Sequence, residues 1–192
     1  EGTQLIKMNI DVHENAGISI LAHCVFANSE NIEHIMDAQI RIRDGAKYEY
    51  QERHVHGPDG GVKVIAKANV EVGKKARFRS EFDLIKGSVG LIDLDYKTTV
   101  DDYGLVDMMA KINGRREDII KINEQSHLKG THSKGVLTSK IAVRDNAQAK
   151  VMNTITADGD YARGHVDCKE IIKDNGQANA IPIVHVRNAK AH

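Results

Sequence analysis

The sequence predicts an all-β protein, a right-handed parallel β-helix with about 30 residues in each coil. Apolar and polar residues alternate in many short runs, which is the pattern of half-buried strands. Turn-forming residues separate these runs, and some of the turns recur at a fixed spacing. Aromatic residues make up only 4% of the 192 residues, and there is no tryptophan. So few large side chains suit a narrow core between closely spaced layers.

The predicted strands follow one another along the chain. The clearest alternation is found in "LIKMNIDV" (5–12), "MDAQIRIR" (36–43), "VKVIAKANVEV" (62–72), "LTSKIAVR" (137–144) and "IPIVHVR" (181–187). Turn clusters such as "RDGA" and "RDNA" lie between such runs. Residues 104–111 and 115–123 fit a strand about as well as a short helix. The middle of the chain, residues 84–140, keeps the period poorly, and we expect degenerate coils there.

A β-branched apolar residue, three polar or small residues and a further small residue recur as one unit. The unit is found at residues 12–16, 42–46, 72–76, 143–147 and 172–176. The first three units follow one another at equal steps of about 30 residues, and the step between the last two is nearly the same. Turns of a β-sandwich also recur, but identical steps of this length favour a solenoid of stacked coils. The sequence therefore predicts one column of Val12, Ile42 and Val72, and a second of Ala16, Ala46 and Ala76.

Charge and composition exclude several classes of protein. Lys plus Arg and Asp plus Glu both number 27, so no general attraction to nucleic acid or to an anionic membrane is expected. No apolar run is long enough to span a bilayer, and the first residues lack the pattern of a signal peptide. Two cysteines are too few for a disulfide scaffold, so we expect a cytoplasmic protein with one domain over residues 1–192.

One cysteine, Cys168, lies in the predicted strand "GHVDCKE" (164–170). Strand alternation places Cys168 on the same face as Val166 and Glu170, whereas His165 faces the other way. A thiolate is the group that iron–sulfur clusters and persulfide transfer both require. A free cysteine is also commonly a small buried hydrophobic residue, so the residues alone leave both interpretations open.

The other cysteine, Cys24, lies in the apolar run at 21–28, and His54 follows it by one period of about 30 residues. Alternation puts Glu52, His54 and His56 on one face of their strand. Cys24, Glu52, His54 and His56 are therefore a candidate site for iron or zinc, with a solvated polar face as the alternative. A disulfide between Cys24 and Cys168 is not expected, because five coils separate them by about 24 Å.

The C-terminal third resembles a known family. The segments "GVLTSK" (135–140), "CKEII" (168–172) and "PIVHVRN" (182–188) resemble successive coils of the SufB/SufD family, the scaffold proteins of the SUF system of iron–sulfur cluster assembly. The resemblance is specific over residues 120–192 and looser before them. The overall pattern is most similar to the shorter SufB/SufD-like proteins of archaea and anaerobic bacteria.

That resemblance implies a parallel β-helix that acts as a scaffold rather than an enzyme. It implies a transient iron–sulfur cluster, a sulfur donor, and a SufC-like ABC ATPase that hydrolyses ATP. It also implies pairing with an identical or paralogous subunit, which we expect through the C-terminal coils around 168–192. Cys168 matches the family's sulfur-accepting cysteine, with His165 as a further candidate ligand. The family's His-Glu-Ala motif and helical ATPase-docking segment are not found in these 192 residues.

Two classes of enzyme are alternatives to the scaffold, and each requires particular residues. A polysaccharide lyase or hydrolase on a β-helix would use aromatic platforms for sugars, and this chain has no tryptophan. A cupin-like or other β-helical metal enzyme would use His54 and His56, although the glutamate that follows the two histidines in cupins is missing. The sequence also lacks the phosphate-binding, nucleophile-elbow, CxxC and HExxH motifs.

Overall fold

The computed structural model describes residues 2–27 and 31–192, except the side chain of Ile85, and these residues form thirteen strands and no helix. The strands are β1 (Gly2–Val12), β2 (Gly17–Phe26), β3 (Ile32–Ile42), β4 (Lys47–His56), β5 (Val62–Val72), β6 (Arg77–Lys86), β7 (Gly90–Val100), β8 (Leu105–Gly114), β9 (Ile119–Leu128), β10 (Lys134–Val143), β11 (Gln148–Ala157), β12 (Arg163–Ile172) and β13 (Gln177–Val186). The two segments that also fitted helices are therefore strands, β8 and β9. No helix able to cross a membrane is found in the described part of the chain.

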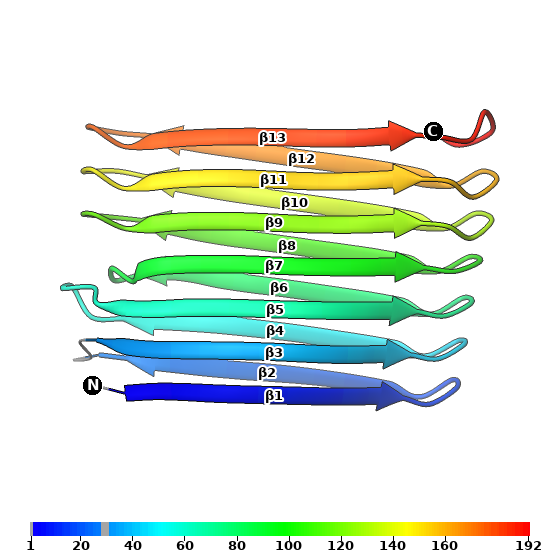
Figure 1. Ribbon diagram of the computed structural model, residues 1–192, viewed down its shortest axis with the longest axis horizontal. Helices are drawn as coiled ribbons and strands as arrows, with labels where there is room; N and C mark the ends of the chain where they lie inside the picture. The colour runs from blue at the N-terminus through cyan, green and yellow to red at the C-terminus, as the bar shows by residue number, and fades with distance from the viewer. Residues whose placement is uncertain (1, 28–30) are drawn as a thin grey trace.

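The strands stack in two sheets that face each other (Figure 1). Seven strands form one sheet in the order β1-β3-β5-β7-β9-β11-β13, and six form the other in the order β12-β10-β8-β6-β4-β2. Each described pair is parallel, so the chain climbs by one strand of each sheet per coil. The predicted parallel β-helix is confirmed. The β-sandwich and cupin alternatives are wrong, because both are built from antiparallel strands.

The predicted columns of stacked residues are present. Pairing in register runs through Val12, Ile42, Val72, Val100, Leu128, Ala157 and Val186. The first two steps of this column are the longest, at about 30 residues, and the steps on either side of Val100 are the shortest. The prediction of degenerate coils in the middle was wrong in part: the strands there pair in parallel like the others, but β6 shifts by one residue against β4 after Leu84, and the turn from β6 to β7 is short.

The alanine column lies at the turn between the two sheets. The backbone N–H of Lys47 donates to the carbonyl of Ala16, and that of Arg77 donates to the carbonyl of Ala46, both at 2.8 Å. Ala46 and Ala76 are buried, since a methyl group is all that the stacked turns admit. The repeat units at 143–147 and 172–176 lie at the opposite edge, where the chain returns from the six-stranded to the seven-stranded sheet.

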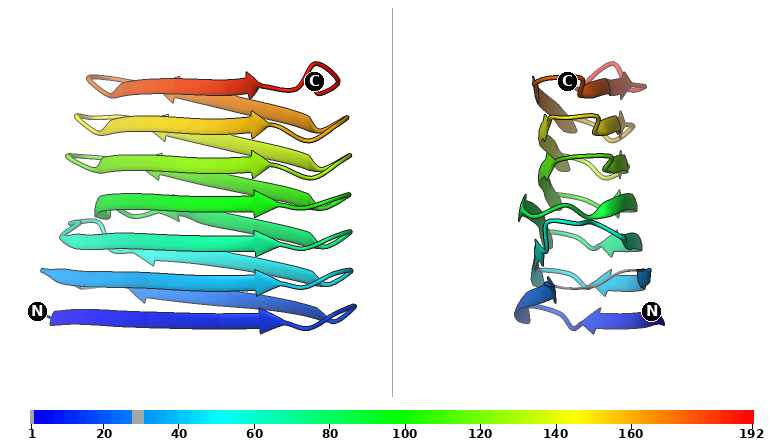
Figure 2. Two further views of the ribbon diagram at one scale, coloured as in Figure 1. Left: turned by 45° about the vertical axis from the view of Figure 1, so that its right-hand side comes forward. Right: turned by 90° about the vertical axis from the view of Figure 1, so that its left-hand side faces the viewer.

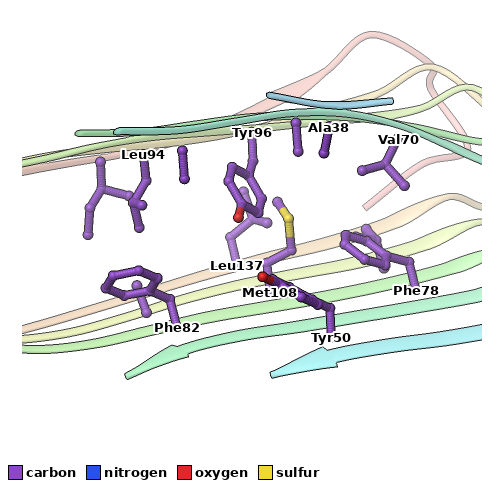
Figure 3. Packing of buried hydrophobic residues seen from close by; sticks show 14 of the residues in the cluster. Ala38, Tyr50, Val70, Phe78, Phe82, Leu94, Tyr96, Met108 and Leu137 are labelled. Carbon is purple, nitrogen blue, oxygen red and sulfur yellow. The ribbon is translucent and has the colours of Figure 1, made fainter. Parts of the chain in front are cut away.

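The core is a single layer of side chains between the two sheets. Side views show how thin the molecule is in this direction (Figure 2). In Figure 3, Leu94, Tyr96 and Val70 of one sheet point towards Phe82 and Leu137 of the other. Alternate residues of every strand enter this layer, which explains why the sequence needs few aromatic residues.

Each of the two sheets has an outermost strand at either side of the stack. The sheets end at β1 and β2 on one side and at β13 and β12 on the other (Figure 1). At the C-terminal end the inward-facing side chains of Ile172, Val184 and Val186 are 54%, 44% and 51% exposed. A strand edge with exposed apolar groups favours pairing with a further strand.

Candidate functional site

Four potential metal ligands converge between the sheets near the N-terminal end. Cys24 comes from β2, His34 from β3, and Glu52 and His54 from β4. Their ligand atoms all lie within 4.8 Å of one another. Cys24 pairs in register with His54, as the period predicted, and strand alternation turns both inward. The last residue of the apolar run around Cys24, Asn28, lies outside the described residues.

The ligand atoms of this cluster lie close together, but only one pair is at ordinary hydrogen-bonding distance. Cys24 Sγ lies 3.7 Å from His34 Nε2 and 4.0 Å from Glu52 Oε1. His34 Nε2 lies 3.8 Å from the same Glu52 oxygen. His54 Nε2 lies 2.6 Å from it, at hydrogen-bonding distance. His34, Glu52 and His54 are buried, and Cys24 is half-buried.

A second layer of groups holds three of these side chains in place. Gln4 Oε1 lies 2.8 Å from His34 Nδ1 and so accepts a hydrogen bond from it. The Tyr50 hydroxyl donates to Glu52 Oε2 at 3.1 Å. His56 Nε2 lies 3.2 Å from His54 Nδ1. The remaining ligand atoms are thereby directed towards the centre of the cluster.

The charges in the cluster are set by burial and by these contacts. Burial acts to raise the pKa of Glu52, but the neighbouring imidazoles of His34 and His54 outweigh it and bring the pKa to about 2. Burial, with a contribution from the charge of Glu52, raises the pKa of Cys24 to about 11. Burial lowers the pKa of His56 to about 4. At neutral pH the apo cluster therefore holds a carboxylate, a protonated thiol and a neutral His56.

The structure brings together three of the four residues predicted for this site. Cys24, Glu52 and His54 converge. His56 is not among the converging ligands, because its Nε2 contacts Nδ1 of His54, the ring nitrogen that points away from Glu52. Sequence reasoning missed His34. Alternation in β3 places His34 on the inward face with Met36, but no spacing in the sequence shows that β3 crosses opposite Glu52.

Cys168 lies at the other end of the helix, on β12, the last strand of its sheet. Its thiol faces inward and packs against the core, as alternation predicted. It stands in register with Ser139, and the Asn153 side-chain amide approaches its sulfur at 4.0 Å. Burial, followed by the charges of Glu170 and Asp167, raises the pKa of Cys168 to about 11.

The other residue predicted for this end does not join Cys168. His165 lies on the outward face of β12 and is exposed, while the thiol points into the core. Within one chain the side chains of His165 and Cys168 therefore lie on opposite faces of the sheet. The two cysteines are both free, and five strand steps of the same sheet separate β2 from β12.

Glu124, on β9, is a further buried group that the sequence did not single out. Its Oε2 has no hydrogen-bond partner among the described residues, and neither does Oδ1 of Asn153, its neighbour in register. Burial raises the pKa of Glu124 to about 8. Its charge also contributes to the raised pKa of Cys168.

Comparison with known proteins identifies two curated archaeal relatives. An iron–sulfur cluster assembly SufBD family protein of Methanocaldococcus jannaschii is 34% identical over 189 residues, which are 98% of this chain and 60% of that protein. A protein of the same description from Pyrococcus horikoshii is 30% identical over 191 residues, which are 100% of this chain and 58% of that protein. This chain thus spans about three fifths of the length of either relative. No family model matches it.

The similarity extends well beyond residues 120–192, where the resemblance was most specific, and it includes both cysteine-bearing ends of the helix. The parallel β-helix agrees with the fold that the resemblance implied. Over nearly its whole length, the chain is therefore a homologue of the iron–sulfur cluster assembly proteins of the SufBD family.

Proposed function

We propose that this chain is the β-helical core of a scaffold for iron–sulfur cluster assembly, and that Cys168 accepts sulfur or iron. The observation that supports this role is the position of Cys168, an inward-facing thiol on the last strand of its sheet. Cys168 is half-buried, so a donor or a partner chain can approach its sulfur.

The raised pKa of Cys168 fits a thiol that reacts only when a partner arrives. At neutral pH it is protonated, which protects it from oxidation. A base on the partner would take the proton, or a bound iron ion would displace it to water. The thiolate would then attack the outer sulfur of a donor persulfide, forming a new S–S bond at Cys168 and releasing the donor's own thiolate.

One chain supplies one thiol at this end among its described residues, and clusters are held by several ligands. We therefore propose that two chains, identical or paralogous, pair through the coils around 168–192 and share a cluster between them. The exposed apolar side chains of Ile172, Val184 and Val186 support this contact. His165, exposed on the outward face, is available to a partner as a further ligand.

The remaining parts of the proposal rest on the family. In this role the chain needs no catalytic centre of its own, because a SufC-like ABC ATPase hydrolyses ATP and a sulfur donor supplies the persulfide. The assembly takes place in the cytoplasm, and the cluster is cargo that the scaffold passes on.

Anaerobic reconstitution with iron and sulfide, followed by visible absorption, tests the role of Cys168. Cys168→Ser keeps the size of the side chain and removes its affinity for iron and sulfur, so cluster absorption should be lost. Cys24→Ser is the matched control and should retain most of the absorption. A normal amount of cluster on Cys168→Ser would contradict the proposal.

Sedimentation tests the pairing. The protein should be a dimer at micromolar concentration, and Val184→Asp should dissociate it by placing a charge in the apolar contact. A parent protein that sediments as a monomer would contradict the shared cluster while leaving the role of Cys168 to the reconstitution experiment.

A further inference from the structure

The geometry points to a second site: we propose that Cys24, His34, Glu52 and His54 bind one divalent transition-metal ion of the Zn²⁺ or Fe²⁺ class. The site is separate from the proposed cluster site, since β2, β3 and β4 lie at the opposite end of the helix from β12. It does not depend on the proposed role of Cys168.

The distances suit a tetrahedral ion after small side-chain movements. Zn²⁺ bonds to nitrogen, oxygen and sulfur at their usual lengths give edges of about 3.3 to 3.6 Å in a tetrahedron. The edges here are 3.7 Å from Cys24 to His34, 3.8 Å from His34 to Glu52 and 4.0 Å from Cys24 to Glu52. The fourth contact, from His54 to Glu52, is shorter at 2.6 Å and would open as both atoms turn to the ion.

The charges of the donors match a divalent cation. A thiolate and a carboxylate carry two negative charges, and two neutral imidazoles carry none, so the loaded site is neutral. Neutrality matters here because His34, Glu52 and His54 are buried, where an unbalanced charge is costly. A mixed set of one sulfur, two nitrogens and one oxygen selects zinc or ferrous iron over magnesium or calcium.

A second layer of contacts orients His34 and Glu52 as metal ligands. His34 donates its Nδ1 proton to Gln4, which leaves a lone pair on Nε2 facing Cys24 and Glu52. Glu52 uses Oε2 for Tyr50 and keeps Oε1 towards the centre. An outer partner that fixes the tautomer and rotation of each ligand is the usual arrangement around protein-bound metals.

An aromatic ring and a half-buried thiol complete the site. The Phe26 ring lies 5.4 Å from that of His34, edge-on, and 6.2 Å from that of His54, between ring centres. The apolar ring limits the number of water molecules that can join the ion. Cys24 is only half-buried, so an ion can reach the site past its side chain.

Titration of the metal-free protein with Co²⁺ tests the proposal, because tetrahedral Co²⁺ has intense visible bands and a thiolate adds a near-ultraviolet charge-transfer band. One equivalent should bind with both signals. Cys24→Ser should remove the charge-transfer band, and Cys168→Ser should leave it unchanged. His34→Gln should weaken Co²⁺ binding at least tenfold, since loss even of an outer-layer group typically weakens metal binding ten- to a hundredfold.

His23→Gln is the matched control for His34→Gln, because His23 adjoins Cys24 in β2 but is exposed on the outward face. It should bind Co²⁺ like the parent protein. Circular dichroism checks that each variant is folded, and His34→Gln keeps the test open where Cys24→Ser fails to fold. Absence of Co²⁺ binding, equal losses in His34→Gln and His23→Gln, or a charge-transfer band that follows Cys168 would each overturn the proposal.

Discussion

Glu124 should make the stability of the protein fall as pH rises. The unfolded chain titrates this carboxyl near 4.5, and burial raises its pKa to about 8 in the folded chain. Between these values the folded state holds a proton that the unfolded state has released. The contribution of Glu124 is therefore fully present below pH 4.5 and is lost progressively as pH rises through 8.

The two pKa values set the size of the effect. A shift of one unit corresponds to about 1.4 kcal/mol, so Glu124 should lower the free energy of unfolding by about 3 kcal/mol at pH 7 and about 5 kcal/mol above pH 9. Glu124→Gln removes this titration. Its amide can also donate to Oδ1 of Asn153, which has no hydrogen-bond partner among the described residues.

Urea unfolding of the parent protein and of Glu124→Gln, from pH 5 to pH 9, measures the difference. The variant should gain stability relative to the parent by about 4 kcal/mol over this range. Glu49→Gln, which changes an exposed carboxylate on the outward face of β4, is the control and should follow the parent curve. Parallel pH profiles for the parent and Glu124→Gln would refute the reasoning.

Two further predictions concern the turns and the core. Lys75→Gly should stabilise the protein by up to about 1 kcal/mol, because Lys75 has a φ of 56° and Gly45 occupies the same turn position one coil earlier. Lys74→Gly is the control and should not stabilise it. A loss of stability in thermal unfolding of Lys75→Gly would count against this account. Leu137→Ala should cost about 2 to 5 kcal/mol in the same assay, because Leu137 is fully buried, and Val136→Ala on the outward face should cost much less.

Most of the fold could be predicted from the sequence because each coil of a solenoid repeats the same pattern of apolar residues and turns. Apolar alternation indicated the inward face of each strand, and the equal spacing of the first three repeat units predicted the stacking of Val12, Ile42 and Val72. The period of the middle coils was not recognised because a short turn before β7 and a one-residue register shift in β6 change the spacing there. A fixed period detects equal coils, whereas the hydrogen-bonded register tolerates turns of different length.

The candidate sites were less predictable, because their residues come from both sheets. Residues of one sheet are related by the period, and this relation correctly paired Cys24 with His54. Residues of opposite sheets are related only through the path of the turns between them. His34 was missed for this reason, and the same limit applies to the contact between Asn153 and Ser139, whose side chains meet across the core at 2.8 Å.

The inward columns of the six-stranded sheet show where its reactive groups lie. One inward column runs through Ala22, Glu52, Phe82, Ala110, Ser139 and Cys168, and the next runs through Cys24, His54, Leu84, Ile112, Ile141 and Glu170. Both columns are apolar on β6 and β8, and their polar and thiol groups lie on β2, β4, β10 and β12. A buried polar group without a partner is costly, so these groups favour bonding to one another, to a metal ion or to a cluster. The two sets of groups therefore mark the two places in this sheet where a metal ion or a cluster can be bound.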